Sequence, residues 1–239
     1  EGGFEVGVRT AIEAMLASPD FVFRMEEAPS GVGFGENYRI SDPDLATRMS
    51  YFIWGLPPDA ELRSLATEGR LSNEGELERQ VTRMLEDPRS EALATRFAAQ
   101  WLRLDDLDKV HPDRLLYPDF HQRLADELRR ETELFFSNLV HQDGSILDLF
   151  TADYSFMNER VARHYGIDGV IGEDFRRVDY ADENRRGLLG HASILTLTSL
   201  ANRTSPVQRG KYVMEVLIGS PPPAPPAVVP PLKEAVDNE

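Results

Sequence analysis

Apolar side chains recur at spacings of three and four residues along most of the chain, which is the period of helices that bury one face. Residues 4–17 form the first such stretch, and Ser18, Pro19 and Asp20 end it. Residues 28–38 hold a proline and three glycines, so they predict a linker. The apolar positions of the first stretch are Phe4, Val8, Ala11, Ile12 and Met15.

Capping residues mark where several of the predicted helices begin. Ser41, Asp59 and Ser205 each offer a side-chain oxygen to the free N–H groups of a first helical turn. Asn73 and Glu76 have the spacing of a capping box. The side chains expected to face the interior of the helices before residue 87 are Leu45, Met49, Phe52, Leu62, Leu65, Ala66, Leu77, Val81, Met84 and Leu85.

The longest predicted helix runs from about Asp119 to His141. Residues 145–166 predict one or two helices that end at Gly166, and residues 188–200 predict another. Residues 175–180 alternate in polarity and predict a short extended segment. The side chains expected inside this half of the chain are Leu93, Phe97, Trp101, Leu104, Leu124, Leu128, Phe135, Leu139, Leu149, Phe150, Phe156, Val161 and Tyr165.

These stripes predict an all-α, or mainly α, fold: an irregular multi-helix bundle with an extended proline-rich C-terminal tail. We expect residues 1–35 to be the end of an N-terminal helical module with its linker, and residues 36–180 to be the main helical module. Residues 181–219 are expected to form a C-terminal helical module packed on it. Residues 220–239 are the tail, which should be polyproline II laid along a surface or free in solvent.

Composition narrows the classes of partner. The 239 residues include 41 acidic and 26 basic side chains, which gives a formal net charge of −15. This charge argues against a nucleic-acid partner and against docking on anionic lipid. No apolar run approaches the roughly 20 residues that span a bilayer, so we expect no membrane span.

Motifs for chemistry are absent from the sequence. The chain has no cysteine, which excludes disulfides, thiolate nucleophiles and covalent c-type haem attachment within it. None of the five histidines follows a Glu by three residues, as a di-iron bundle requires. Neither a nucleophile elbow nor a phosphate-binding glycine loop occurs. We therefore expect no catalytic, cofactor-binding or metal-binding residue and no cofactor in this chain.

One carboxylate on the long helix leaves an alternative open. Glu131 borders the apolar face and lies one turn after Glu127, so burial could raise its pKa and make it an acid or base. Arginines at neighbouring positions favour ion pairing instead. An enzyme would be supported if Glu131 converged with His121 or His164 in a cleft.

The other candidate residues lie near the C-terminus. Arg203, Arg209 and Lys211 surround the start of the last predicted helix, where free N–H groups also favour an anion. A capped turn whose basic residues pair with acids is the favoured explanation of the same pattern. With the proline tail, these positions are the candidate partner-binding residues: Arg203, Arg209, Lys211, Pro221, Pro222, Pro223, Pro225 and Pro226.

Six short segments are distinctive when taken together. They are Ser18–Phe21, Ser50–Asp59, Arg130–Phe136, Phe156–Arg160, Arg186–Ser193 and Arg203–Val207. This set resembles the successive domains of unknown function found in planctomycete-type cytochrome c proteins. On this resemblance, residues 1–35 look like the end of one module, about 42–172 like a second and about 185–235 like a third.

The resemblance implies an exported bacterial protein, periplasmic and peripheral to the membrane, in an electron-transport setting. We expect the chain to be part of a longer polypeptide, with any haem outside these residues. The first hypothesis is a non-catalytic extrinsic subunit that docks on and stabilises a membrane-bound electron-transfer complex, respiratory or photosynthetic, beside a cytochrome c subunit. The second is a module of a periplasmic redox or hydrolytic enzyme whose haem or catalytic part lies outside this chain. The third is a scaffold between domains of a longer polypeptide.

Overall fold

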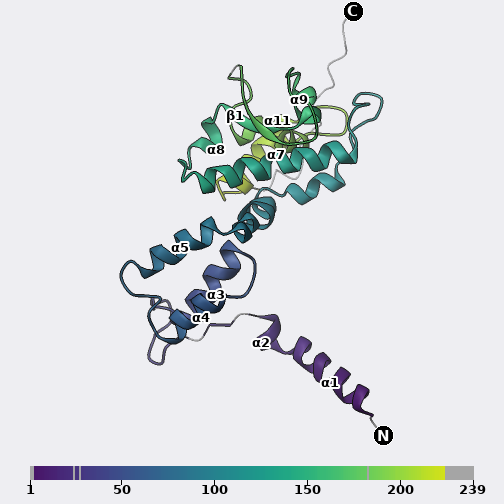
Figure 1. Ribbon diagram of the computed structural model, residues 1–239. Coiled ribbons are helices and arrows are strands. Elements are labelled where there is room, and N and C mark those ends of the chain that lie inside the picture. The colour runs from purple at the N-terminus through teal and green to yellow at the C-terminus, as the bar shows by residue number, and fades with distance from the viewer. Residues whose placement is uncertain (1–2, 24, 27, 182, 224–239) are drawn as a thin grey trace, which may run out of the picture. The chain divides into compact units, whose positions relative to one another are not determined.

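The computed structural model describes residues 3–23, 25–26, 28–181 and 183–223, and these residues are mainly helical (Figure 1). The described part contains one small sheet of two strands. The mainly α fold class is therefore confirmed. The chain divides into two compact units, residues 1–84 and 85–239, which we call unit 1 and unit 2. Among the described residues, no helix is both long and apolar enough to cross a membrane.

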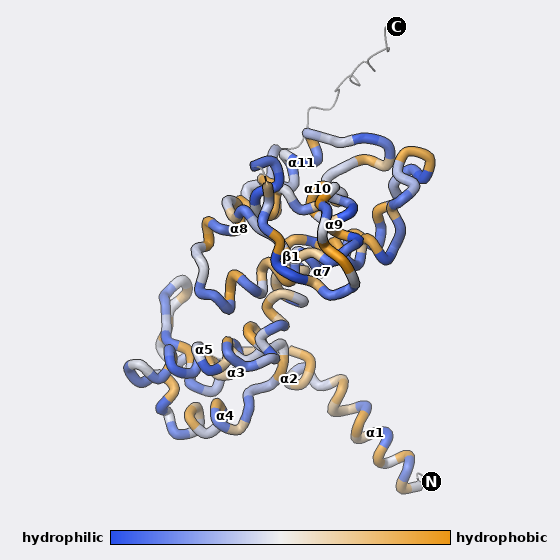
Figure 2. The backbone as a smooth tube through the Cα atoms, turned by 45° about the horizontal axis from the view of Figure 1, so that its top comes forward, coloured by the Kyte–Doolittle hydropathy of each residue, from blue (hydrophilic) through white to orange (hydrophobic). Residues whose placement is uncertain are grey.

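Unit 1 contains helices that follow the predicted stretches closely. The helix predicted over residues 4–17 and the linker at residues 28–38 are confirmed. In Figure 2, apolar positions recur along the whole of the first helix, and none of its residues is buried. The helices of this unit are α1 (Phe4–Ala17), α2 (Pro19–Val22), α3 (Asp42–Ile53), α4 (Ala60–Thr67) and most of α5 (Glu76–Glu86).

Two of the three predicted caps lie in unit 1 and are confirmed. The Asp44 amide donates to Ser41 Oγ over 3.2 Å, and the Leu62 amide donates to Asp59 Oδ1 over 3.0 Å. The predicted capping box is wrong, because α5 begins at Glu76 itself and Asn73 lies outside its first turn. The Glu76 carboxylate instead accepts hydrogen bonds from side chains later in the same helix.

Two side chains predicted inside unit 1 are exposed. Phe52 and Leu77 both face solvent, and the buried positions nearby are Trp54 and Gln80. The fully buried Trp54 indole donates from Nε1 to the Met84 carbonyl over 2.9 Å. A large side chain with a satisfied N–H therefore fills the interior at the end of α3.

Unit 2 is built around α7 (Gln122–His141), and its other elements include short 3₁₀ and π segments. The α-helices are α6 (Ala99–Trp101), α8 (Asp148–Thr151), α9 (Glu159–Tyr165), α10 (Ala192–Leu197) and α11 (Pro206–Tyr212). The shorter segments are η1 (Pro88–Glu91), η2 (Leu93–Ala98), η3 (Leu104–Lys109), η4 (Leu188–Gly190) and η5 (Val213–Leu217). The strands are β1 (Tyr154–Met157) and β2 (Arg176–Asp179).

The long helix α7 carries the predicted core face. Leu124, Leu128, Phe135 and Leu139 are all buried, as expected. The helix begins after His121, whose Nδ1 accepts from the Leu124 amide over 3.1 Å. It contacts β1, α9, α10, η2 and η3, so it lies at the centre of unit 2 (Figure 1).

The prediction of helix throughout residues 145–166 is wrong for its middle part. Tyr154–Met157 is a strand that pairs antiparallel with Arg176–Asp179, which confirms the extended segment predicted at 175–180. Strand alternation turns Ser155 and Met157 inward. Phe97 and Phe150, both predicted inside, are each about 40% exposed. Gly166 ends α9 in the left-handed conformation, as expected of a helix C-terminus.

The C-terminal part is helical where predicted, with shorter elements. The helix predicted at 188–200 is the 3₁₀ turn η4 followed by α10. Ser205 caps α11, because its Oγ accepts from the Gln208 amide over 3.3 Å. Of the predicted proline tail, residues 221–223 have no regular structure and the rest lies outside the described residues.

Candidate functional site

The polar cluster that distinguishes unit 2 is centred on Glu131. This residue follows Leu124 and Leu128 and precedes Phe135 at helical spacing, so α7 points its carboxyl into the interior. The side chain is 0% exposed. A buried carboxyl in an apolar stripe has to find its hydrogen-bond partners inside the protein.

Two hydroxyl groups supply those partners. Ser155 Oγ, turned inward by β1, donates to Oε1 of Glu131 over 2.7 Å. The hydroxyl of Tyr165, the last residue of α9, donates to Oε2 over 2.7 Å. Within the part of the chain that the structure describes, no Lys or Arg donates a hydrogen bond to this carboxyl.

Burial dominates the electrostatics of Glu131. It raises the pKa of the carboxyl to about 7, against partial lowering by the two hydroxyl donors and by the Arg185 charge. The Arg185 guanidinium lies over the Tyr165 ring, 4.8 Å from its centroid. Burial and the neighbouring Glu131 raise the pKa of the Tyr165 hydroxyl well above its ordinary value. Both groups therefore keep their protons across the acidic pH range.

His191 is the second buried titratable group of the cluster. Its Nδ1 lies 3.0 Å from Thr132 Oγ1, and its Nε2 lies 3.4 Å from Ser155 Oγ. The ring packs edge-on against Phe135, with centroids 4.9 Å apart. Burial lowers the pKa of His191 to about 3, so the imidazole is neutral at ordinary pH.

The cluster joins segments that are far apart in the sequence. The Ala192 amide donates to the Tyr165 hydroxyl over 2.7 Å. The hydroxyls of Thr132 and Ser193 lie 2.7 Å apart. Hydrogen bonds therefore connect the start of α10 to both α7 and α9. We call this set of residues the Glu131 cluster: Glu131, Thr132, Ser155, Tyr165, Arg185, His191 and Ser193.

A glycine fixes how the C-terminal segment approaches this cluster. Gly187 has φ +62°, and its amide donates to the Ala152 carbonyl over 3.0 Å. A Cβ at this position would lie 2.5 Å from the backbone carbon of Phe150. Only glycine allows the two backbones to come this close.

Three residues of the Glu131 cluster combine the residue types of a known catalytic arrangement with complete burial. Ser155, His191 and Glu131 are the residue types of a hydrolytic triad, and each is 0% exposed. The Ser155 hydroxyl binds the carboxyl directly at 2.7 Å, whereas the imidazole stands 3.4 Å away. In this conformation the Ser155 hydroxyl is closed off from solvent.

His121 and His164, the two histidines whose convergence with Glu131 would have supported an enzyme, do not contact it. His121 caps α7 ten residues before Glu131, which places it about 15 Å away along the helix axis. His164 packs its ring against Tyr165 at 5.7 Å, on the surface of α9. The expected pairing of Glu131 with a neighbouring arginine is not formed either, since Arg129 and Arg130 bind Glu133. No group of three or more His, Asp or Glu side chains among the described residues is arranged to hold a metal ion.

The basic residues near α11 contact different groups and do not form one shared site. Arg209 donates from Nε to Thr198 Oγ1 over 3.4 Å, and Lys211 lies 3.5 Å from Glu215. Arg203 is exposed beside the isolated bridge between Ser199 and Thr204. Of the candidate prolines, Pro221 and Pro223 are exposed and Pro222 is half-buried, while Pro225 and Pro226 lie outside the described residues.

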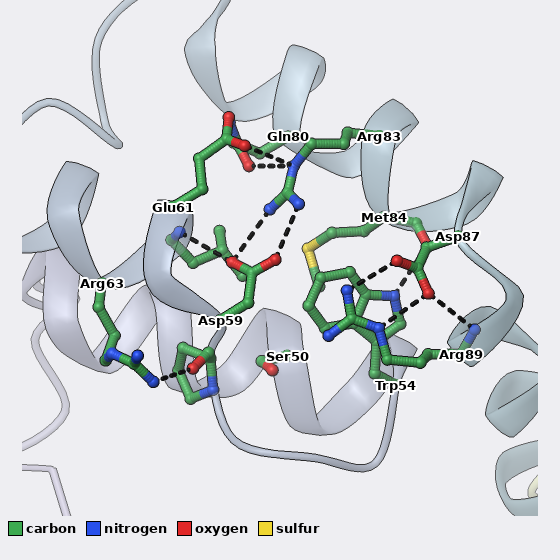
Figure 3. A network of polar contacts seen from close by, with 12 residues as sticks. Ser50, Trp54, Asp59, Glu61, Arg63, Gln80, Arg83, Met84, Asp87 and Arg89 are labelled. Atoms are coloured by element: carbon green, nitrogen blue, oxygen red, sulfur yellow. Dashed lines mark hydrogen bonds and ion pairs between the residues drawn. The ribbon is translucent and has the colours of Figure 1, made fainter.

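Unit 1 has a polar network of its own, which ties α4 to α5. The Arg83 guanidinium points toward the carboxylates of Asp59 and Glu61, at 2.8 and 3.6 Å (Figure 3). The buried Gln80 amide donates to Glu61 over 2.8 Å, and this bond is the main cause that lowers the Glu61 pKa. Each of these side chains binds another side chain of the network, so the network stabilises the helix pair.

Sequence reasoning missed most of the Glu131 cluster. His191, Ser155 and Tyr165 come from three elements, and their side chains meet only once β1 and α9 have folded against α7. One local signal was present: a histidine inside the apolar run from Leu188 to Leu200. A polar residue in such a run has to be satisfied internally.

Comparison with known proteins gives two matches to protein families. Neither the curated proteins nor the solved structures include a significant match. Residues 185–239 match PSCyt3, described as a protein of unknown function (DUF1588). Residues 40–167, more than half of the chain, match PSD4, described as a protein of unknown function (DUF1592). The chain belongs to the PSD4 family.

Proposed function

We propose that this chain is a non-catalytic extrinsic subunit that docks on a membrane-bound electron-transfer complex, respiratory or photosynthetic, at its periplasmic side. The expected partner is a protein subunit of that complex, in particular a cytochrome c. The observation that supports the proposal is a contrast between buried polar residues and an exposed apolar surface. Glu131, Ser155 and His191 are buried inside unit 2, whereas an apolar helix face is left uncovered in unit 1.

The uncovered face belongs to α1. Phe4 is 87% exposed and Met15 is 60% exposed, and Val8 and Ile12 lie between them on the same side of the helix. Single exposed apolar residues are common on proteins, but a helical row of them marks a surface that another protein covers. Phe21 in α2, the next helix, is also exposed. We call the row of Phe4, Val8, Ile12 and Met15 the α1 face.

Charge and family names support the electron-transfer setting. The net charge of −15 suits a partner with a basic face, because complementary charge raises the association rate and fixes the register of docking. The name PSCyt3 points toward a cytochrome, in line with the cytochrome c proteins that the sequence resembles. Such a location is also compatible with a chain in which no described helix can span a membrane.

Co-purification from membranes of cells that produce the full chain tests the proposal. We expect the chain to be recovered with an electron-transfer complex at low ionic strength and in smaller amount at high ionic strength. The double variant Val8→Glu/Ile12→Glu should lose the complex. The matched variant Thr10→Glu/Ala14→Glu adds the same charge to the other side of α1 and should retain it.

Two results would contradict the proposal. One is a chain that never accompanies a membrane electron-transfer complex at any salt concentration. The other is a redox or hydrolytic activity that follows the chain through purification, which would instead favour a module of a periplasmic enzyme whose haem or catalytic part lies outside these residues.

A further inference from the structure

The Glu131 cluster combines residues from both family matches within unit 2. Glu131, Ser155 and Tyr165 lie within the PSD4 match, at residues 40–167. His191 and Ala192 lie within the PSCyt3 match, at residues 185–239. Within unit 2, the hydrogen bonds of this cluster therefore hold residues 185–198, which we call the C-terminal segment, onto α7 and α9.

We propose that Glu131 is a proton switch that controls how firmly the C-terminal segment is held against α7 and α9. The segment is held when the carboxyl is protonated and is loosened when the carboxyl ionises. This inference concerns the interior of unit 2 and does not depend on the proposed docking function.

The hydrogen bonds give this switch its two states. A protonated Glu131 donates its own O–H to Ser155 Oγ, which frees the serine hydroxyl to turn toward Nε2 of His191, 3.4 Å away. The Thr132 hydroxyl, 3.0 Å from Nδ1, continues this chain of polar groups to Ser193. An ionised Glu131 can only accept a hydrogen bond from the Ser155 hydroxyl, so this hydroxyl no longer donates to His191. A buried anion held by two hydroxyls is then relieved by opening to water.

The charged groups around Glu131 leave it without a competing partner. On α7, Glu127 is bound by Arg160 and Arg123, and Glu133 is bound by Arg129 and Arg130. From α9 the cluster is faced by Tyr165, with His164 against its ring. After β2 come Tyr180, whose buried hydroxyl lies close to Ser155 and Glu131, and Arg185, which stacks on Tyr165 and donates to the Gly190 carbonyl over 3.4 Å. From the C-terminal segment the only titratable side chain in the cluster besides Arg185 is His191.

The direction of the pH effect follows from burial. The Glu131 pKa is about 7 when closed and returns to its ordinary value near 4.5 when the segment opens. Raising the pH from 4.5 to 7 therefore favours opening, about tenfold per pH unit, and the effect levels off above 7. His191, with a closed pKa of about 3 against an ordinary 6.5, acts in the opposite direction below pH 6.5. The two effects nearly cancel between pH 4.5 and 6.5, so the unmodified protein alone is a poor test.

Hydrogen exchange of the full chain and its Glu131→Gln variant separates the two effects. The reporter is the Ala192 amide, which binds the Tyr165 hydroxyl, and its protection is corrected for the intrinsic pH dependence of exchange. Because His191 is common to both proteins, the ratio of the variant's protection to that of the unmodified chain isolates Glu131. We expect this ratio to rise about tenfold per pH unit from 4.5 to 7 and then to stay constant. Helix α4 of unit 1 is the internal control and should show a constant ratio.

A ratio that does not change with pH overturns the proposal. If Glu131→Gln fails to fold, the unmodified chain still decides the question through the chemical shift of the Glu131 carboxyl carbon. A titration near pH 7 in the folded protein supports the switch, and a titration near 4.5 excludes it.

Discussion

The hydroxyl of Tyr212 donates a hydrogen bond to the carbonyl oxygen of Leu102, 2.9 Å away and 110 residues earlier in the chain. The Trp101 indole makes the reverse link, donating to the Val216 carbonyl over 2.8 Å. These bonds join α11 and η5 to the segment that precedes α7. The described residues of the PSCyt3 match, 185–223, are thus folded into unit 2 together with residues 85–167 of the PSD4 match.

Tyr212→Phe should lower the free energy of unfolding by about 1 kcal/mol, because it removes one buried hydrogen bond without creating a large cavity. Urea denaturation followed by circular dichroism measures the change. Tyr117→Phe, at an exposed tyrosine in the same unit, is the control and should leave the midpoint unchanged. Equal effects of both variants would show that the Tyr212 contact adds nothing.

Gly187→Ala should be far more harmful than Gly169→Ala. Both glycines have positive φ, so each substitution strains the backbone by about 1 kcal/mol. A Cβ at Gly169 meets open space, whereas one at Gly187 meets the Phe150 backbone at 2.5 Å. We expect Gly187→Ala to cost at least about 1 kcal/mol more in denaturant unfolding. Similar losses for the two variants would contradict the close approach.

Asp59→Ala should destabilise the α4–α5 pair by about 1–2 kcal/mol, because it removes the cap of α4 and one partner of Arg83 together. Hydrogen exchange of the α4 amides reports this change directly. Glu78→Ala, at an exposed position on α5, is the matched loss of a carboxylate and should leave α4 protection as it is. Unchanged protection in Asp59→Ala would exclude the proposed role of the unit 1 network.

Acid should destabilise unit 2 through His191. Its pKa is lowered on folding, so the stability it contributes is present above pH 6.5 and is lost as the pH falls toward 3. Below about pH 4.5, where Glu131 no longer offsets it, the loss reaches about 1.4 kcal/mol per pH unit. Urea unfolding of His191→Asn across this range should show a shallower decline.

The exposed His111→Asn provides the comparison for that acid series. It should follow the unmodified protein at every pH. If the unfolding free energies of His191→Asn and His111→Asn fall equally as the pH is lowered, protonation of the buried His191 imidazole is not the cause of the acid destabilisation.

Local signals in the sequence were sufficient for much of the helical framework. Ser41, Asp59 and Ser205 cap the helices that they were expected to cap. The apolar spacing of α7 correctly gave its buried face, including Leu128 and Phe135. Capping and periodicity succeed here because both depend on residues within one or two turns of each other.

The errors arose where a distant partner decides the outcome. Tyr154–Met157 is an apolar stretch whose sequence is compatible with helix or strand. It forms a strand because it pairs with Arg176–Asp179, some twenty residues later in the chain. Phe52 was predicted to be buried, but Trp54 is the buried residue instead, and its indole donates to the carbonyl of Met84 in another helix. The Glu131 cluster needs α7, β1, α9 and α10 together, so spacing along one helix could not reveal it.

Site-specific photo-crosslinking at Ile12 tests the central claim most directly, since this residue lies in the middle of the α1 face. A photoreactive amino acid is placed at Ile12 or, as the matched control, at Thr10 on the other side of α1, and crosslinked proteins are identified by mass spectrometry. Docking through the α1 face predicts that Ile12 crosslinks to a subunit of a membrane-bound electron-transfer complex and that Thr10 does not. Crosslinks from Ile12 that never include such a subunit, or that match those from Thr10, would contradict the account.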